Sequence, residues 1–102
     1  MKKSGIELIA EERKEQIEKH GKTVDFDVKV NHFGQIKDAA IMLLGGEVDI
    51  DEENHCPFNW DDDIWDKMMG KSKIDRLIIA GALIAAEIDR LQSLNNPPLP
   101  AK

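Results

Sequence analysis

Three features are scarce in this sequence: cysteines, basic residues and long apolar runs. Cys56 is the only cysteine, so an intramolecular disulfide is excluded and the chain fits a reducing compartment. The longest uncharged apolar run, residues 77–86, is half of the ~20 residues that a membrane-spanning helix needs. At the start of the chain, Lys2 and Lys3 are followed by Ser4 and a charged segment rather than by the apolar core of a secretory signal. We therefore expect a cytoplasmic protein with no membrane segment.

Acidic residues outnumber basic ones, 20 to 14, which gives a formal net charge of −6. A protein that follows a nucleic-acid backbone needs a basic face, so direct binding to that backbone is not expected. With 102 residues, of which 41% are apolar and 33% charged, the chain has room for one globular core with solvated faces. We expect a single domain over residues 1–94 and a proline-rich tail over residues 95–102.

Apolar residues recur at helical spacing in four segments, which predicts an all-α fold. Main helices are expected over residues 6–20, 33–44 and 73–94, and a short helix that follows Asp61-Asp62-Asp63 and ends before Gly70. The last main helix is apolar around most of its middle, so we expect it to be buried on several sides. The predicted fold is a compact bundle of three main helices and one short helix.

The segments between these helices carry boundary signals. Ser72, followed three residues later by Asp75, matches a capping box and marks the start of the last helix. Asn31 is a candidate N-cap for the second main helix. Residues 23–30 alternate loosely between apolar and polar, but a lone strand is unstable, so we expect an extended connector, with an edge strand as the alternative. Residues 47–59 are acidic and irregular and are expected to form a long loop.

Arg13 points into the middle of the apolar stripe of the first helix. A guanidinium group facing a core must meet a carboxylate or several carbonyls, because an unpaired buried charge is very costly. The nearest acids on an apolar helix are Glu87 and Asp89, just after the apolar run. We predict an ion pair between Arg13 and Glu87, with Glu12 or Asp89 as the second choice. Such a pair would fix the helix register without doing chemistry.

Candidate metal ligands and nucleophiles are few. Glu11, Glu12 and Glu15 form the spacing EExxE, which can place carboxylates on adjacent turns around a magnesium ion, but Glu11 and Glu15 also suit a solvated face. His55 and Cys56 are neighbours, yet no further ligands stand at zinc spacing. Cys56 is interpreted as a small buried group rather than a nucleophile.

Two features are typical of interfaces. Trp60, Trp65 and Met68 belong to an apolar set next to the acidic loop, which either plugs the end of the bundle or binds a partner. Gly81 lies among alanines, so a neighbouring helix can approach closely at this point. That neighbour is either the first helix or the same helix of a second copy.

A set of short motifs is spread along the chain: Ile9-Ala10-Glu11-Glu12-Arg13, Gln16, Gly21, Ala39-Ala40, Pro57, Trp60-Asp61, Trp65, Arg76-Leu77 and the final run AGALIAAEIDRL at residues 80–91. Through these motifs most of the chain, residues 5–91, resembles a family of small proteins that are common in bacteriophages and prophages. Many members of that family have no known activity. The resemblance therefore implies a phage-associated helical protein rather than a particular reaction.

The chain is also distantly similar to the MazG-like, all-α nucleoside triphosphate pyrophosphohydrolases, in which EExxE and a later ExxD hold magnesium. Glu11, Glu12 and Glu15 fit the first half of that pattern. No ExxD occurs here, and Glu87-Ile88-Asp89 is one residue too short. The similarity implies a magnesium ion on Glu12, Glu15 and Glu87 or Asp89, and cleavage between the α and β phosphates.

Two functional hypotheses follow from the sequence. The first is a non-enzymatic accessory protein without a cofactor, which binds a protein partner or a second copy through Gly81 or through the Trp60 and Trp65 end. The second is a magnesium-dependent hydrolase of (deoxy)nucleoside triphosphates. The missing ExxD and the lack of a glycine-rich phosphate loop favour the first.

Overall fold

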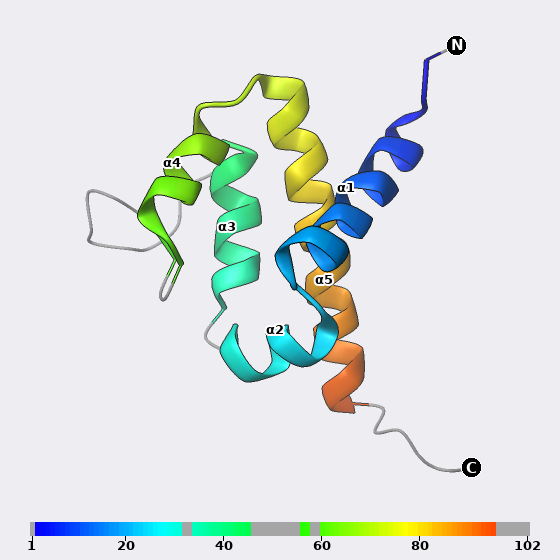
Figure 1. Ribbon diagram of the computed structural model, residues 1–102, viewed down its shortest axis with the longest axis vertical. Helices are drawn as coiled ribbons and strands as arrows, with labels where there is room; N and C mark the ends of the chain where they lie inside the picture. The colour runs from blue at the N-terminus through cyan, green and yellow to red at the C-terminus, as the bar shows by residue number, and fades with distance from the viewer. Residues whose placement is uncertain (1, 32–33, 46–55, 58–59, 96–102) are drawn as a thin grey trace.

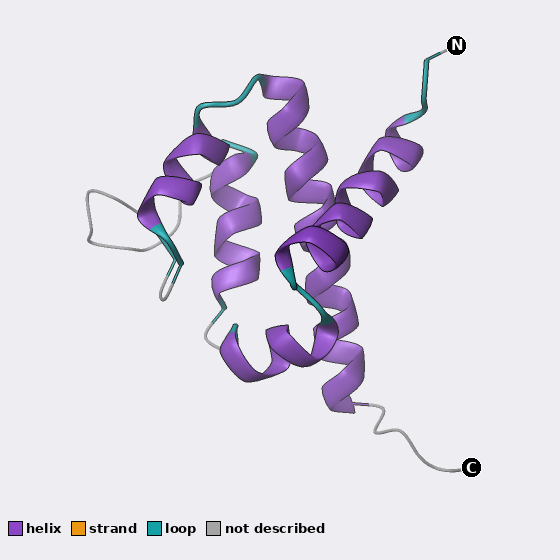
Figure 2. Cartoon of the chain, in the orientation of Figure 1, coloured by secondary structure: helices purple, strands orange, loops and turns teal. Residues whose placement is uncertain are grey.

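The computed structural model contains five α-helices and, within the residues that it describes, no strand. Those residues are 2–31, 34–45, 56–57 and 60–95. In chain order the helices are α1 (Gly5–His20), α2 (Val24–Val30), α3 (Gln35–Leu43), α4 (Asp62–Met69) and α5 (Lys73–Asn95) (Figure 1 and Figure 2). The predicted all-α bundle is confirmed, and α2 is an additional short helix.

The long helix α5 organises the bundle. α1, α2 and α3 all pack against it, and α1 crosses it at an angle while α3 runs beside it (Figure 1). The buried core joins α3, α4 and α5, and its main members are Ile36, Ala39, Leu43, Trp65, Ile79, Ala80 and Leu83. Small side chains at Ala39 and Ala80, both fully buried, allow α3 and α5 to lie close together.

Local capping residues set the helix ends. Ser4 and Glu7 form a capping box at the start of α1: Ser4 Oγ accepts from the Glu7 N–H at 3.2 Å, and Glu7 Oε1 accepts from the Ser4 N–H at 2.7 Å. Gly21 ends α1 in the left-handed conformation, with φ of 67°. The predicted N-cap of α5 is confirmed, because Ser72 Oγ accepts from the Asp75 N–H at 3.2 Å. The start of the central helix is therefore fixed by local sequence.

The expectation of an extended connector at residues 23–30 was wrong, because Val24–Val30 forms helix α2. Thr23 Oγ1 accepts from the Phe26 N–H at 3.2 Å, and Asp25 and Asp27 stand in the first turn, where acids favour the helix dipole. α2 also packs on α5. This packing outweighs the weak helix propensity of its three valines.

Asn31 was expected to cap the second main helix, and this was also wrong. Asn31 closes α2 as its C-cap, while α3 begins after Gly34, whose φ is 82°. Three predicted segments lie outside the described residues: Phe33, most of the expected acidic loop (47–55 and 58–59) and residues 96–102 of the expected tail. Asn95, which was expected to begin the tail, is the last residue of α5. Within the described residues, no helix combines the length and hydropathy that crossing a membrane would require.

Candidate functional site

A groove of about 770 Å³ separates α1 and α2 from α4. α5 contributes apolar residues to it, among them Ile78, Ile79 and Leu83, and α4 contributes Ile64 and Met68. A cavity of this volume falls within the ~300–1,000 Å³ typical of ligand sites. Buried polar side chains gather where α1 and α2 meet α5, so this end of the groove is the first place to examine for chemistry.

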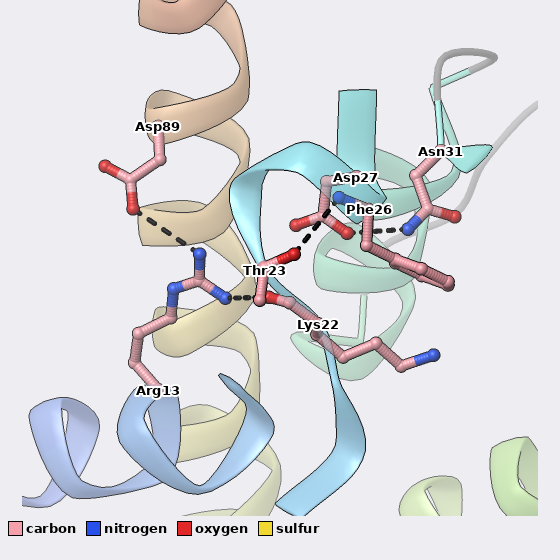
Figure 3. A network of polar contacts seen from close by, with 7 residues as sticks. All are labelled: Arg13, Lys22, Thr23, Phe26, Asp27, Asn31 and Asp89. Atoms are coloured by element: carbon pink, nitrogen blue, oxygen red, sulfur yellow. Dashed lines mark hydrogen bonds and ion pairs between the residues drawn. The ribbon is translucent and has the colours of Figure 1, made fainter. Parts of the chain in front are cut away.

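Arg13 is buried at that end of the groove, as the sequence predicted. Its Nη1 donates to the carbonyl oxygen of Lys22 at 3.0 Å, and its Nη2 lies 3.5 Å from Oδ2 of Asp89 (Figure 3). The side chain of Asp89 is 45% exposed, so solvent screens this ion pair. The Nε of Arg13 is buried and has no hydrogen-bonding partner among the described residues.

The predicted partner of Arg13 was Glu87, and the structure corrects this. Both carboxylate oxygens of Glu87 accept from Arg90, at 2.9 and 2.8 Å, and raise the pKa of that guanidinium group. The pair links positions i and i+3 of α5, and the guanidinium fork matches the carboxylate. Glu87 and Asp89 are two positions apart, so their side chains point in nearly opposite directions around the helix, and Asp89 is the one that faces Arg13 of α1.

Asp27 of α2 is a buried carboxylate that the sequence reading did not single out. The residue is 2% exposed, and its Oδ1 accepts from Nδ2 of Asn31 at 2.8 Å. Its Oδ2 is buried without a hydrogen-bonding partner among the described residues. Burial raises the pKa of Asp27, while the bond from Asn31 and the charges of Arg13, Lys22 and Arg90 oppose that rise.

Asn31 connects α2 to the segment before α4. Its Oδ1 accepts from Nε1 of Trp60 at 2.9 Å, while its amide group donates to Asp27. Both the oxygen and the nitrogen of the Asn31 side chain therefore have a hydrogen-bonding partner, which explains why this side chain can be buried. The spacing of Asp27 and Asn31, one helical turn apart, was the only sequence signal of this pair, and it is visible only once the segment is taken as a helix.

The four carboxylates proposed as magnesium ligands do not come together. Glu12 and Glu15 line the groove, and Glu12 accepts from Gln16 at 3.3 Å. Glu87 pairs with Arg90, and Asp89 with Arg13. In the described part of the chain, no three His, Cys, Asp or Glu side chains are grouped as metal ligands would be. The residues present therefore do not fit the magnesium site that the MazG-like similarity implies.

Cys56 has the environment of a structural thiol. Its Sγ donates to the carbonyl oxygen of Trp60 at 3.5 Å. Burial, followed by hydrogen bonding to Asp62 and its negative charge, raises the pKa of the Cys56 thiol to about 12. A nucleophilic cysteine needs a lowered pKa, so this thiol is a poor nucleophile at neutral pH. His55 lies outside the described residues.

The tryptophan residues serve mainly to pack the bundle. Trp65 is 2% exposed within the core, and the ring of Trp60 meets it edge to face at a centroid distance of 6.0 Å and an interplanar angle of 75°. Met68 packs against the same core and keeps part of its surface in the groove. Phe58 lies outside the described residues. Trp65 is thus buried by contacts within the chain, whereas Trp60 and Met68 are only half-buried.

Gly81 allows α1 to approach α5 closely. A Cβ at this position would lie 2.6 Å from Cδ1 and 2.9 Å from Cγ1 of Ile9. The sequence allowed either the first helix or a second copy as the neighbour of Gly81. In the structure that neighbour is the first helix, α1. A second copy would have to bind elsewhere on α5.

A second candidate site lies on the side of α5 that neither α1 nor α3 covers. We define this outer face as Leu77, Ile84, Ile88 and Leu91 of α5 with Leu44 of α3. Each of these five side chains is between 42% and 51% exposed. A shallow apolar groove of about 220 Å³ runs along it between α3 and α5, and Ile84, Ile88 and Leu44 line it.

α5 is buried on several sides, as expected, because α1, α2 and α3 pack on it. The sequence pattern, which is apolar around the helix, did not predict that one side stays exposed. On α1, the apolar residue Ile6 is likewise exposed. An aliphatic row that the described part of the chain leaves uncovered is a candidate binding surface.

Comparison with known proteins found no matching family model, no matching curated protein and no matching solved structure. The function must therefore be argued from the geometry of the groove and of the outer face.

Proposed function

We propose that this protein is a non-enzymatic accessory protein of the phage or prophage type that acts by binding another protein chain through the outer face of α5. The observation that carries the proposal is the row formed by Leu77, Ile84, Ile88 and Leu91, all about half exposed on one side of a single helix. Scattered apolar residues are normal on a protein surface, but a contiguous row marks an interaction site.

The position of the row supports this proposal. The two ends of the row, Leu77 and Leu91, are fourteen residues apart, which corresponds to about 21 Å along the helix. That length suits the docking of a helix of about four turns. Leu44 and Ile41 of α3 flank the row and add to its apolar border. Covering these side chains removes apolar surface from water, which is the main driving force for association.

A photo-crosslinking amino acid placed at Ile88 tests the proposal in cells that produce the protein. We expect a discrete crosslinked adduct from Ile88, and we expect Leu77→Glu on the same face to abolish it. The matched control position is Ile64 of α4, which is 59% exposed but belongs to the groove. If Ile88 gave no adduct, or if Ile64 gave the same adduct, the outer face would not be the binding surface.

The large groove favours a second candidate function, the MazG-like hydrolysis of (deoxy)nucleoside triphosphates. Its volume of about 770 Å³ can hold a nucleotide-sized molecule, and Glu12 and Glu15 line it. No magnesium-dependent step is derived, because the proposed carboxylates do not converge. Calorimetric titration with magnesium and a nucleotide panel, followed by a pyrophosphate-release assay, tests this alternative. Turnover that is lost in Glu12→Gln would support it and would count against a purely binding role.

A further inference from the structure

We infer that the chain bound at the outer face is a second copy of this protein, with the two α5 helices antiparallel across a two-fold axis at Ile84. This inference rests on the proposed function and names its partner. It is argued from the spacing of the row, from the charges at its two ends and from its area.

Three of the four members of the row on α5 are spaced symmetrically about Ile84. Leu77 and Leu91 each stand seven residues from Ile84, on nearly the same side of the helix. In an antiparallel pair centred on Ile84, the two Ile84 side chains meet at the axis, and Leu77 of each copy faces Leu91 of the other. A two-fold interface requires such a self-complementary surface, in which each residue meets its counterpart reciprocally.

The charges at the two ends of the row favour the antiparallel arrangement over the parallel one. Lys73 stands at the N-terminal end of α5 on the side of the row, while the last turn of α5 carries no basic residue. Parallel helices would bring the two Lys73 side chains together. The antiparallel pair instead places each Lys73 beside the C-terminal end of the other helix, near Asn95, where the helix dipole favours a cation.

The area of the row corresponds to a weak dimer. Leu44, Leu77, Ile84, Ile88 and Leu91 are each 42–51% exposed. Covering these five residues on both copies removes roughly 800 Å² from water, and the flanking residues bring the total near ~1,000 Å², the lower limit for a specific interface. The shallow groove between α3 and α5 gives the partner's side chains a place to insert.

Cysteine crosslinking tests both the partner and its direction. The native Cys56 thiol, with a pKa of about 12, is a weak background reactant at neutral pH. The variants are Ile84→Cys, Leu77→Cys and Leu91→Cys, with Ile64→Cys as the exposed control on α4. Each variant, alone or mixed with another, is oxidised mildly, and the masses of the products are measured. In each mixture one variant carries a mass tag, so that a mixed dimer can be told from a dimer of one variant.

We expect Ile84→Cys to form a covalent dimer by itself, since its position lies on the axis. Leu77→Cys and Leu91→Cys should each form no covalent dimer when oxidised alone, but should crosslink to each other when the two variants are mixed. Ile64→Cys should not crosslink. Self-crosslinking of both Leu77→Cys and Leu91→Cys would mean parallel helices and would overturn the inference. So would the absence of any crosslink on the outer face.

Sedimentation across a range of concentrations supplies the second measurement. The unmodified protein should shift from monomer to dimer, and Ile88→Glu should raise the dissociation constant at least ~10-fold, while Ile64→Glu leaves it unchanged. Circular dichroism checks that Ile88→Glu stays folded. A monomer at every concentration would overturn the inference. The proposed function would survive that result if the Ile88 photo-adduct had the mass of this chain plus a different protein, and it would fail with the inference if no adduct formed.

Discussion

On the groove side of α5, charged and amide side chains are buried, whereas on its outer face aliphatic side chains are exposed. Arg13, Asp27 and Asn31 lie inside where α1 and α2 meet the helix. Ile84 and Ile88 lie outside, each about half exposed. The two regions lie on different sides of α5.

The comparison separates two roles that one helix can carry. Buried polar groups cost free energy unless they are paired, so the groove side must supply partners such as the Lys22 carbonyl and the Asn31 amide. Exposed aliphatic groups cost little in the isolated chain but release free energy when they are covered. The groove side therefore determines how the chain folds together, and under the proposed function the outer face determines what it binds.

The largest effect is expected when an isoleucine of α5 is replaced by alanine, once in the core and once on the outer face. Ile79 lies in the core and is 5% exposed, whereas Ile88 lies on the outer face and is 50% exposed. Ile79→Ala should lower the free energy of unfolding by about 2–5 kcal/mol, because it leaves a cavity. Ile88→Ala should change it by less than about 1 kcal/mol, since half of the side chain is already in water and alanine favours the helix.

Urea denaturation at low protein concentration measures both variants, because dimer formation would otherwise add to the stability of the unmodified protein. Equal losses for Ile79→Ala and Ile88→Ala under these conditions would contradict the division between the two faces.

The second prediction compares the two members of the Arg13–Asp89 ion pair. Arg13→Ala removes a buried guanidinium group and its bond to the Lys22 carbonyl, and we expect a loss of about 3 kcal/mol. Asp89→Ala removes the partly exposed member of a pair separated by 3.5 Å, and we expect a loss below about 1 kcal/mol. Thermal unfolding of both variants measures the difference. A loss for Asp89→Ala as large as that for Arg13→Ala would mean that the ion pair, rather than the carbonyl contact and packing, holds Arg13.

The third prediction concerns Asp27 and pH. Burial raises the pKa of Asp27 above its ordinary value of 3.8. Between the ordinary and the raised pKa, the folded protein therefore holds a proton that the unfolded chain has released. The stability that this group contributes is complete below pH 3.8 and falls as pH rises through the raised pKa. Asp27→Asn resembles the protonated form and should lose that part of the pH dependence.

At neutral pH, Asp27→Asn should lie within about 1 kcal/mol of the unmodified protein, whereas Asp27→Ala should cost about 1–3 kcal/mol because Asn31 loses its acceptor. Denaturation curves from acid to neutral pH give the stability difference between the unmodified protein and Asp27→Asn. That difference should move in favour of Asp27→Asn as pH rises, and the opposite direction would contradict the assignment.

The helix ends show how far local sequence predicts this fold. Ser72, Gly21 and the acids at residues 61–63 mark boundaries through bonds within one turn, so their signals are contained in a few neighbouring residues. α2 was missed because its alternating valines suit a strand as well as a helix. The choice depends on packing against α5, which is some fifty residues away in the chain.

The sites were predictable only in part, for a similar reason. The burial of Arg13 follows from its place in an apolar stripe, but its partner depends on how α1 crosses α5, and two residues along a helix reverse the direction of a side chain. The exposure of the outer face was not predicted, because an apolar pattern records which surfaces avoid water. It does not record whether the same chain or another one covers them.

The smallest effect is expected where α1 meets α5, between the two faces. Gly81→Ala gains about 1 kcal/mol of helix propensity, but its Cβ would overlap Cδ1 and Cγ1 of Ile9, and overpacking costs about 1–3 kcal/mol. Ile9 is only half-buried and can partly move aside, so we expect a net loss of about 1 kcal/mol. In the background of Ile9→Ala, where the two clashing atoms are absent, Gly81→Ala should become stabilising. A double-mutant cycle by urea denaturation gives this coupling. A Gly81→Ala effect with the same sign and size in both backgrounds would show that the glycine serves something other than the approach of α1.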